Sequence, residues 1–210
     1  MTSENAGFGP APYGVVRARS ADDAPEAVAE GVYRRRDFLP PASLLRVLDA
    51  LGRLSASWRP SEALGLLGRG ATGQVGAGAL AVQTPLDEIR AILAPATLDW
   101  ARRCGFWFPR PPQLQLFPVR MVGDAERPAR QEPHMDSHPT HPGPPICTNV
   151  FYPKLRDVSG GDLAVQVAGS SGPARVRPAA NDIVSFAGER VHWVEPLFAG
   201  ERVSLVVNFY

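Results

Sequence analysis

From about residue 112 onward, the chain consists of short β-leaning segments separated by turn-forming residues. Several short strands at this spacing are typical of an all-β sandwich or barrel rather than of alternating strands and helices. The C-terminal half is therefore expected to fold as a β-barrel or jelly roll. The expected strands are QLQLFPVRM (113–121), ICTNVFY (146–152), DLAVQV (162–167), ARVRP (174–178), DIVSF (182–186) and RVSLVVNFY (202–210).

The preceding part of the chain predicts helices. After an expected strand at 31–39, Pro40 and Pro41 suit the first turn of a helix. Apolar residues then recur every three or four positions in ASLLRVLDALGRL, which indicates an amphipathic helix. A second helix is expected over 85–104, capped by Thr84.

A glycine-rich stretch separates the two expected helices. Six glycines fall between residues 65 and 78, which predicts a segment without regular structure. GRGATGQ resembles a phosphate-binding loop but lacks the Lys-Ser/Thr pair that reaches phosphate and Mg²⁺. A mobile loop is expected, and a lid over an active site is compatible with it.

Length and composition favour one soluble domain. The chain has 210 residues, of which 44% are hydrophobic and 20% charged, within the ordinary range of a single globular domain. We expect a loose N-terminal arm (1–30), a helical support layer (31–111) and a jelly-roll core (112–210). The predicted fold class is mainly β with N-terminal helices, in a double-stranded β-helix or cupin-like barrel.

Charge, hydropathy and cysteine content limit the expected partners and the expected location of the protein. The chain has 22 Lys and Arg residues and 21 Asp and Glu residues, which gives a net charge of +1. A chain this close to neutral has no broad positive potential that would attract nucleic acid or acidic lipid. No apolar run approaches the length of a membrane span, and the first residues do not resemble a signal peptide. The two cysteines match no disulfide framework, so a cytoplasmic location is expected.

His134 and Asp136 are the first candidates for metal ligands. In an extended strand, side chains two positions apart point to the same face, so these two can hold one ion. His192, which follows the expected strand DIVSF, is the candidate third ligand. Two imidazoles and one carboxylate form the facial triad typical of non-heme Fe(II) oxygenases. His138 and His141 lie nearby, and we expect both outside the metal's ligand sphere.

The final expected strand places a second group beside the triad. Alternation puts Arg202 and Ser204 on one face, with Val206, Asn208 and Tyr210, and the apolar residues Val203, Leu205, Val207 and Phe209 on the other. The apolar face is expected to pack against the helical layer. A buried arginine needs an anionic partner, and Arg202 aided by Ser204 would suit a dicarboxylate.

This order of residues resembles the Fe(II)/2-oxoglutarate-dependent oxygenases. The residues are H-x-D, a histidine 56 positions after the aspartate, an arginine ten beyond that and a serine two further on. A Gly-Gly-Asp-Leu turn (160–163) and Phe186 before HWVEPL resemble the prolyl 4-hydroxylase-like branch. The resemblance is strong over 112–210.

The resemblance implies a jelly roll that uses Fe(II), 2-oxoglutarate and O₂. His134, Asp136 and His192 would bind the iron and be the catalytic group, and Arg202 with Ser204 would bind the distal carboxylate of 2-oxoglutarate. The family often carries a tyrosine on the strand before H-x-D, where this chain has Phe117. Gln115 or Asn149 is expected to take that place.

The reaction implied is hydroxylation of an unactivated C–H bond, with release of succinate and CO₂. Desaturation or ring closure on the same site, nucleic-acid demethylation, and a cupin metalloprotein or binding module that does not use 2-oxoglutarate remain alternatives. The expected substrate is a free small molecule, an amino acid or a natural-product intermediate. The sequence does not indicate the oligomeric state.

Overall fold

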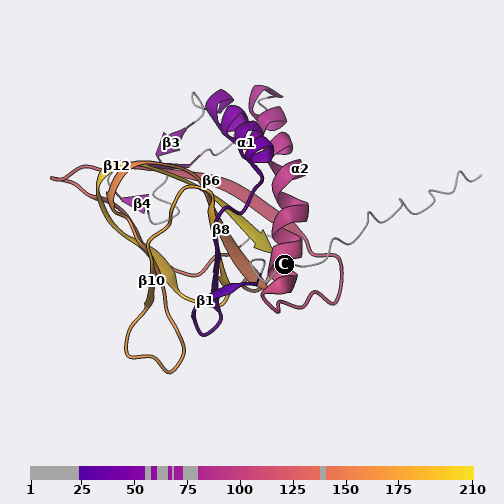
Figure 1. The fold of residues 1–210 in the computed structure, drawn as a ribbon. Coiled ribbons are helices and arrows are strands. Elements are labelled where there is room, and N and C mark those ends of the chain that lie inside the picture. The colour runs from indigo at the N-terminus through magenta and orange to yellow at the C-terminus, as the bar shows by residue number, and fades with distance from the viewer. Residues whose placement is uncertain (1–23, 55–57, 61–65, 68, 73–79, 138–140) are drawn as a thin grey trace, which may run out of the picture.

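The computed structural model describes residues 24–54, 58–60, 66–67, 69–72, 80–137 and 141–210. Two helices, α1 (Pro41–Arg53) and α2 (Leu80–Arg103), lie on one side of a strongly curved antiparallel sheet (Figure 1). The strands are β1 (Glu26–Ala29), β2 (Val32–Arg35), β3 (Arg59–Pro60), β4 (Leu66–Leu67), β5 (Arg69–Thr72), β6 (Leu114–Val122), β7 (Ala129–His134), β8 (Cys147–Gly160), β9 (Leu163–Val165), β10 (Ala174–Val176), β11 (Asp182–Ala187) and β12 (His192–Phe209).

Strand β12 connects the whole barrel. The main strand order is β1-β2-β11-β8-β12-β6-β5-β3. The first part of β12 pairs with β7 and β9, and its second part pairs with β6 and β8. One continuous strand therefore belongs to both walls of the barrel, which is the arrangement of a jelly roll.

The bend of β12 falls at Gly200, where the sequence predicts a turn across EPLFAG. The segment remains in the strand, and its pairing with β8 shifts register on both sides of Ala199. Gly200 has a φ of +82°, and a Cβ there would lie 2.3 Å from the carbonyl oxygen of Arg156. A bulge therefore replaces the expected turn, because glycine alone accepts this conformation and this close approach.

The hydrophobic core lies on both faces of the sheet. Val203, Leu205, Val207 and Phe209 of β12 pack outward against the helices, in one cluster with Val47, Leu51, Ile89, Leu93 and Trp100. The prediction that this face meets the helical layer is confirmed. Two further clusters fill the barrel interior; they include Val119, Met121, Val150, Tyr152, Leu163, Phe186, Val194 and Leu197.

The prediction of a mainly β, jelly-roll fold with N-terminal helices is confirmed. Each of the six segments expected to be strands contains or overlaps an observed strand. β7 was not among them, because ARQEPH carries little apolar alternation and a proline. The second helix begins at Leu80 rather than after Thr84, so Thr84 lies inside the helix and is not its cap.

Two expected irregular segments contain strands. Within the expected N-terminal arm, residues 26–29 form β1 and pair with β2, while residues 1–23 lie outside the described part of the chain. Within the glycine-rich stretch, β4 and β5 pair with β7 and β6. The prediction of no regular structure is wrong for those two segments, because strand partners supply the hydrogen bonds that local sequence does not. The other residues of the stretch are not described.

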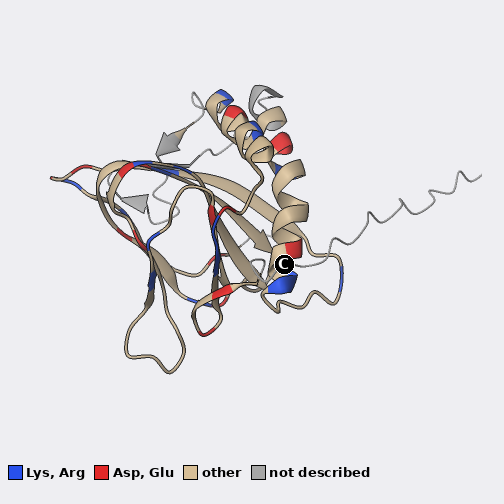
Figure 2. Ribbon diagram, viewed as in Figure 1, with Lys and Arg blue, Asp and Glu red and all other residues tan. Residues whose placement is uncertain are grey.

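Charged residues are interspersed over the surface elements. Figure 2 shows both basic and acidic positions on the helices and on several strands, in keeping with a net charge of +1. Among the described helices, none combines the length and the apolar character that a membrane span requires.

The packing of β12 against the helices predicts the effect of two leucine substitutions. Leu205→Ala should lower the free energy of unfolding by about 2–5 kcal/mol, because Leu205 is fully buried in the helix-facing cluster. The matched variant Leu45→Ala should change it by less than about 0.5 kcal/mol, since that side chain is 67% exposed. Urea unfolding measures both; equal losses would show that Leu205 does not lie in the core.

Candidate metal centre

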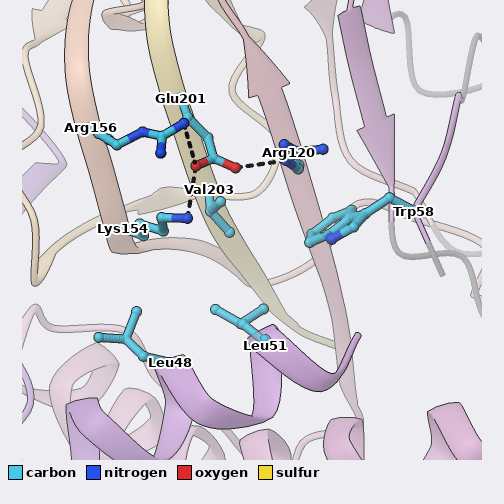
Figure 3. Close-up of a pocket in the computed structure, with 9 residues that line it drawn as sticks. Leu48, Leu51, Trp58, Arg120, Lys154, Arg156, Glu201 and Val203 are labelled. Carbon is cyan, nitrogen blue, oxygen red and sulfur yellow. Dashed lines mark hydrogen bonds and ion pairs between the residues drawn. The ribbon is translucent and has the colours of Figure 1, made fainter. Parts of the chain in front are cut away.

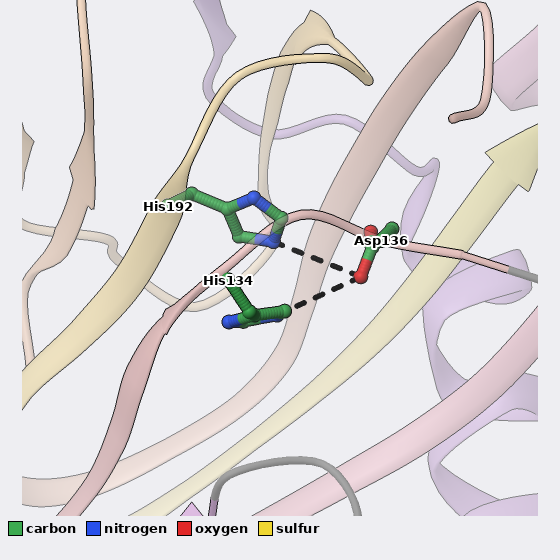
Figure 4. Close-up of side chains that lie close together, drawn as sticks. All are labelled: His134, Asp136 and His192. Carbon is green, nitrogen blue, oxygen red and sulfur yellow. Dashed lines mark ion pairs between the residues drawn. The ribbon is translucent and has the colours of Figure 1, made fainter. Parts of the chain in front are cut away.

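The register of two strands brings the three predicted metal ligands together. His134 ends β7 and is the antiparallel partner of His192, which begins β12. Asp136 follows His134 by two residues and turns toward the same point (Figure 4). Nε2 of His134 lies 3.6 Å and Nε2 of His192 lies 3.8 Å from Oδ1 of Asp136. All three ligand atoms lie within 4.8 Å of one another, close enough to bind one ion.

The backbone fixes the orientation of both imidazoles. Nδ1 of His134 lies 2.8 Å from the Glu132 carbonyl oxygen, and Nδ1 of His192 lies 3.1 Å from that of Arg190. Each Nδ1–H can donate to a carbonyl, which leaves the Nε2 lone pair directed at the centre, the tautomer that metal ligation needs. The Gln131 side-chain amide lies 3.2 Å from His134 Nε2 and would have to move for a metal to bind there.

The charge state of the centre also suits a divalent cation. Burial alone would raise the pKa of Asp136, but the adjacent His134 and His192 side chains outweigh burial and hold it below its ordinary value. Thr148 donates a 3.0 Å hydrogen bond to Oδ2, the carboxylate oxygen that does not face the histidines. Burial lowers the pKa of His192, which favours the neutral imidazole that a metal requires.

His134 differs from His192 in exposure. Its side chain keeps 25% exposure, against 8% for Asp136 and 6% for His192. Burial lowers its pKa, but the neighbouring Asp136 carboxylate and the hydrogen bond to the Glu132 carbonyl outweigh burial and raise it. The centre is therefore closest to solvent on the His134 side.

A buried arginine lies on the interior face of β12, as predicted. Arg202 is 1% exposed, and no carboxylate pairs with it among the described residues. Its terminal nitrogens lie 3.3 Å from the Tyr152 hydroxyl, 3.4 Å from Ser204 Oγ and 3.5 Å from the Met121 sulfur. Nε has no hydrogen-bond partner there. The buried Arg202 guanidinium therefore keeps an unpaired donor and a positive charge that no described carboxylate neutralises.

Tyr152 contacts Arg202, although the sequence pattern did not point to it. Its ring is buried beneath the Arg202 guanidinium, with 4.9 Å between Arg202 Cζ and the ring centroid. Its hydroxyl oxygen accepts a hydrogen bond from the same guanidinium. The family resemblance places a tyrosine on the strand before H-x-D, where this chain has Phe117. Alternation along 146–152 could have found it, because Thr148, Val150 and Tyr152 share the interior face.

Asn149 lies on the opposite face and does not fit the cosubstrate role expected for it. Its neighbours Cys147 and Phe151 pack in the helix-facing cluster. Its amide donates to the Val207 carbonyl at 3.0 Å, and its oxygen accepts from Ser185, which in turn accepts from Trp100 of α2. Asn149 therefore connects the sheet to the helical layer.

Gln115 lies on the interior face but close to the metal ligands rather than to Arg202. Its Oε1 accepts hydrogen bonds from Asn208 and Tyr210 at 3.3 Å and 3.1 Å, and the Asn208 amide helps to lower the pKa of Asp136. His141 stacks on Tyr210, contacts Gln113 and is not part of the metal-ligand group. His138 lies outside the described residues.

Comparisons with known proteins give structural neighbours alone. No family model matches the sequence, and no curated protein matches it. A 2OG-Fe(II) oxygenase family oxidoreductase from Burkholderia pseudomallei aligns at 18% identity and a TM-score of 0.65, covering 86% of this chain and 85% of its own. A prolyl-4-hydroxylase from Pseudomonas putida aligns at 22% identity and 0.59, covering 85% and 91%.

A third neighbour was solved with a peptide. It is a prolyl hydroxylase from Trichoplax adhaerens in complex with a hypoxia inducible factor peptide fragment, at 13% identity, a TM-score of 0.63 and coverage of 86% and 83%. At these identities the similarity establishes the fold: the chain has the architecture of the prolyl hydroxylase-like 2OG-Fe(II) oxygenases, as the sequence resemblance predicted.

The geometry of the centre predicts that Asp136→Ala binds a divalent metal at least about tenfold more weakly, because Asp136 is the single anionic member of the group. Glu132→Ala, which removes an exposed carboxylate paired with Arg130, should leave the affinity unchanged. Calorimetric titration with Mn²⁺ measures both variants. Unchanged affinity in Asp136→Ala would exclude Asp136 as a ligand.

Proposed function

We propose that this protein is an Fe(II)- and 2-oxoglutarate-dependent dioxygenase that hydroxylates an unactivated C–H bond. The observation that carries the proposal is the combination of two sites on the interior face of β12: His192 completes the His134, Asp136 group, and Arg202 is buried with a free Nε donor. The fold shared with the 2OG-Fe(II) oxygenases supports it.

Each residue has a distinct role in this proposal. His134 and His192 bind the iron through Nε2, and Asp136 neutralises part of its charge, with Thr148 holding the carboxylate in place. Arg202, with Ser204 and the Tyr152 hydroxyl, binds the distal carboxylate of 2-oxoglutarate. A two-pronged arginine contact fits a carboxylate, and a phenolic hydroxyl can donate to the same group.

The interior of the barrel supplies the dry environment that oxidation of a C–H bond requires. Val119, Met121, Val150 and Leu197 are buried there, so charge pairs are strengthened and water is excluded. Fe(II), 2-oxoglutarate and O₂ would supply the oxidation itself: one atom of O₂ would be inserted into the C–H bond, and the other would enter succinate as CO₂ is released.

We propose a free small molecule as substrate, an amino acid or a natural-product intermediate. The substrate would approach from the His134 side, where the centre is closest to solvent.

The activity is tested by succinate formation from 2-oxoglutarate under Fe(II) and air, with a panel of amino acids and a proline-containing peptide. At least one amino acid should raise succinate above the uncoupled rate and gain one oxygen atom by mass spectrometry. Stimulation by the peptide alone would overturn the small-molecule proposal, and a product that loses hydrogen would show desaturation or ring closure. Absence of succinate under all conditions would overturn the dioxygenase assignment.

The cosubstrate role of Arg202 predicts a separate binding defect. Arg202→Lys keeps the charge but loses the planar fork, so affinity for 2-oxoglutarate should fall by about tenfold or more, while metal affinity changes little. Arg175→Lys, at an exposed arginine paired with Glu195, is the matched control. Anaerobic titration by charge-transfer absorbance measures both; equal dissociation constants would remove the cosubstrate assignment.

A further inference from the structure

A cavity of about 480 Å³ lies between helix α1 and the outer face of the sheet (Figure 3). Leu48 and Leu51 of α1 face it from one side, and β6, β8 and β12 form the other. Glu201 and Val203 line the cavity, whereas Arg202, between them, points into the barrel. The cavity is therefore separated from the metal centre by the thickness of the sheet, and nothing in the proposed oxygenase reaction uses it.

Three cationic side chains from two strands converge on one carboxylate in this cavity. Nε of Arg120 lies 2.8 Å from Glu201 Oε1, and Nζ of Lys154 lies 2.7 Å from Oε2. Arg156 reaches the same Oε2 at 3.7 Å. Burial alone would raise the pKa of Glu201, but the hydrogen bonds from Lys154 and Arg120 outweigh burial and lower it. Glu201 is therefore ionised, and the cluster has two more positive than negative charges.

The excess positive charge faces the open side of the cavity. The Glu201 side chain is 7% exposed, whereas those of Arg120, Lys154 and Arg156 are 38%, 45% and 68% exposed. Arg120 contacts Glu201 through Nε, which leaves the two terminal nitrogens of the planar fork free to bind a second anion, as far as the described contacts extend. The carboxylate thus holds the cations in place from beneath.

Apart from the charged cluster, the described side chains that line the cavity are apolar. Leu48, Leu51 and Val203 line it beside the cations, and the Trp58 ring borders the side next to Arg120. The volume lies within the range of about 300–1,000 Å³ that is usual for small-molecule sites, where a few polar groups fix orientation and apolar groups supply contact area. A single strong cationic edge and an apolar wall select for a ligand with one acidic and one apolar end.

We propose that this cavity is a second binding site, for a small organic carboxylate that carries a flat apolar group. The carboxylate would pair with the Arg120 fork and Lys154, and the apolar group would lie between Trp58 and the α1 leucines. The site stands independently of the proposed oxygenase activity, because its binding requires neither metal nor 2-oxoglutarate.

Lys154 provides a direct reporter, because it is the single lysine of the chain. Reductive methylation with ¹³C-formaldehyde keeps its charge and gives one lysine dimethyl signal in NMR spectra of the full chain. Titration with 2-naphthoate should shift this signal in a saturable way, while the neutral 2-naphthamide and the purely ionic acetate should shift it at least about tenfold less effectively.

Two substitutions should act in opposite directions. Arg120→Gln should weaken 2-naphthoate binding by about tenfold, because the planar fork is lost. Glu201→Gln should tighten it severalfold, because the internal competitor for the cations is removed while the side-chain shape is kept. Arg177→Gln, at an exposed arginine that pairs with Asp162 and lies outside the cavity, should leave the affinity unchanged.

The outcomes separate this proposal from its alternatives. An unshifted Lys154 signal, equal shifts with 2-naphthamide, or weakening by Arg177→Gln as large as that by Arg120→Gln would overturn it. Weaker binding in Glu201→Gln would also overturn it if thermal melting shows that variant folded. Loss of the oxygenase activity in the succinate assay would not affect any of these readouts.

Discussion

Strand β12 is the element on which the rest of the structure depends, because both of its faces are buried and each meets a different environment. Its outward residues Leu205 and Val207 contribute to the packing against α1 and α2. Its inward residues Arg202 and Ser204 line the barrel near Tyr152. Pairing with four other strands holds it in register. A one-residue slip would place Arg202 in the apolar helical layer and Leu205 in the interior, so the register that gives the core also gives the site.

The bulge at Gly200 allows one strand to serve both walls of the barrel. Before it, β12 brings His192 opposite His134; after it, β12 places Arg202 in the barrel interior. The two polar functions are thus on a single rigid element, supported by backbone carbonyls behind the imidazoles and by Thr148 behind Asp136. Such support limits rotation of the ligands, which a preorganised metal centre requires.

The same alternation gives the outer face of the sheet a polar cluster at the edge of the helical layer. Glu201 and Val203 face outward on either side of the inward Arg202. The cavity beneath α1 and the barrel interior are therefore lined from opposite faces of the same strand, and none of the three candidate metal ligands lines the cavity. The internal carboxylate offsets one of three cations there.

The sequence by itself determined the β-rich half, the amphipathic α1, the H-x-D spacing and the two faces of the last strand, because these depend on periodicity within a few residues. It did not determine β7, β4 and β5, whose hydrogen bonds come from distant strands, or the start of α2. The sequence pattern placed Asn149 in the barrel interior, whereas in the structure its side chain points toward the helices and connects through Ser185 to Trp100. Only the tertiary structure brought Tyr152 to Arg202 and His192 opposite His134, since these contacts span 50 and 58 residues of chain and no local pattern encodes which strands become neighbours.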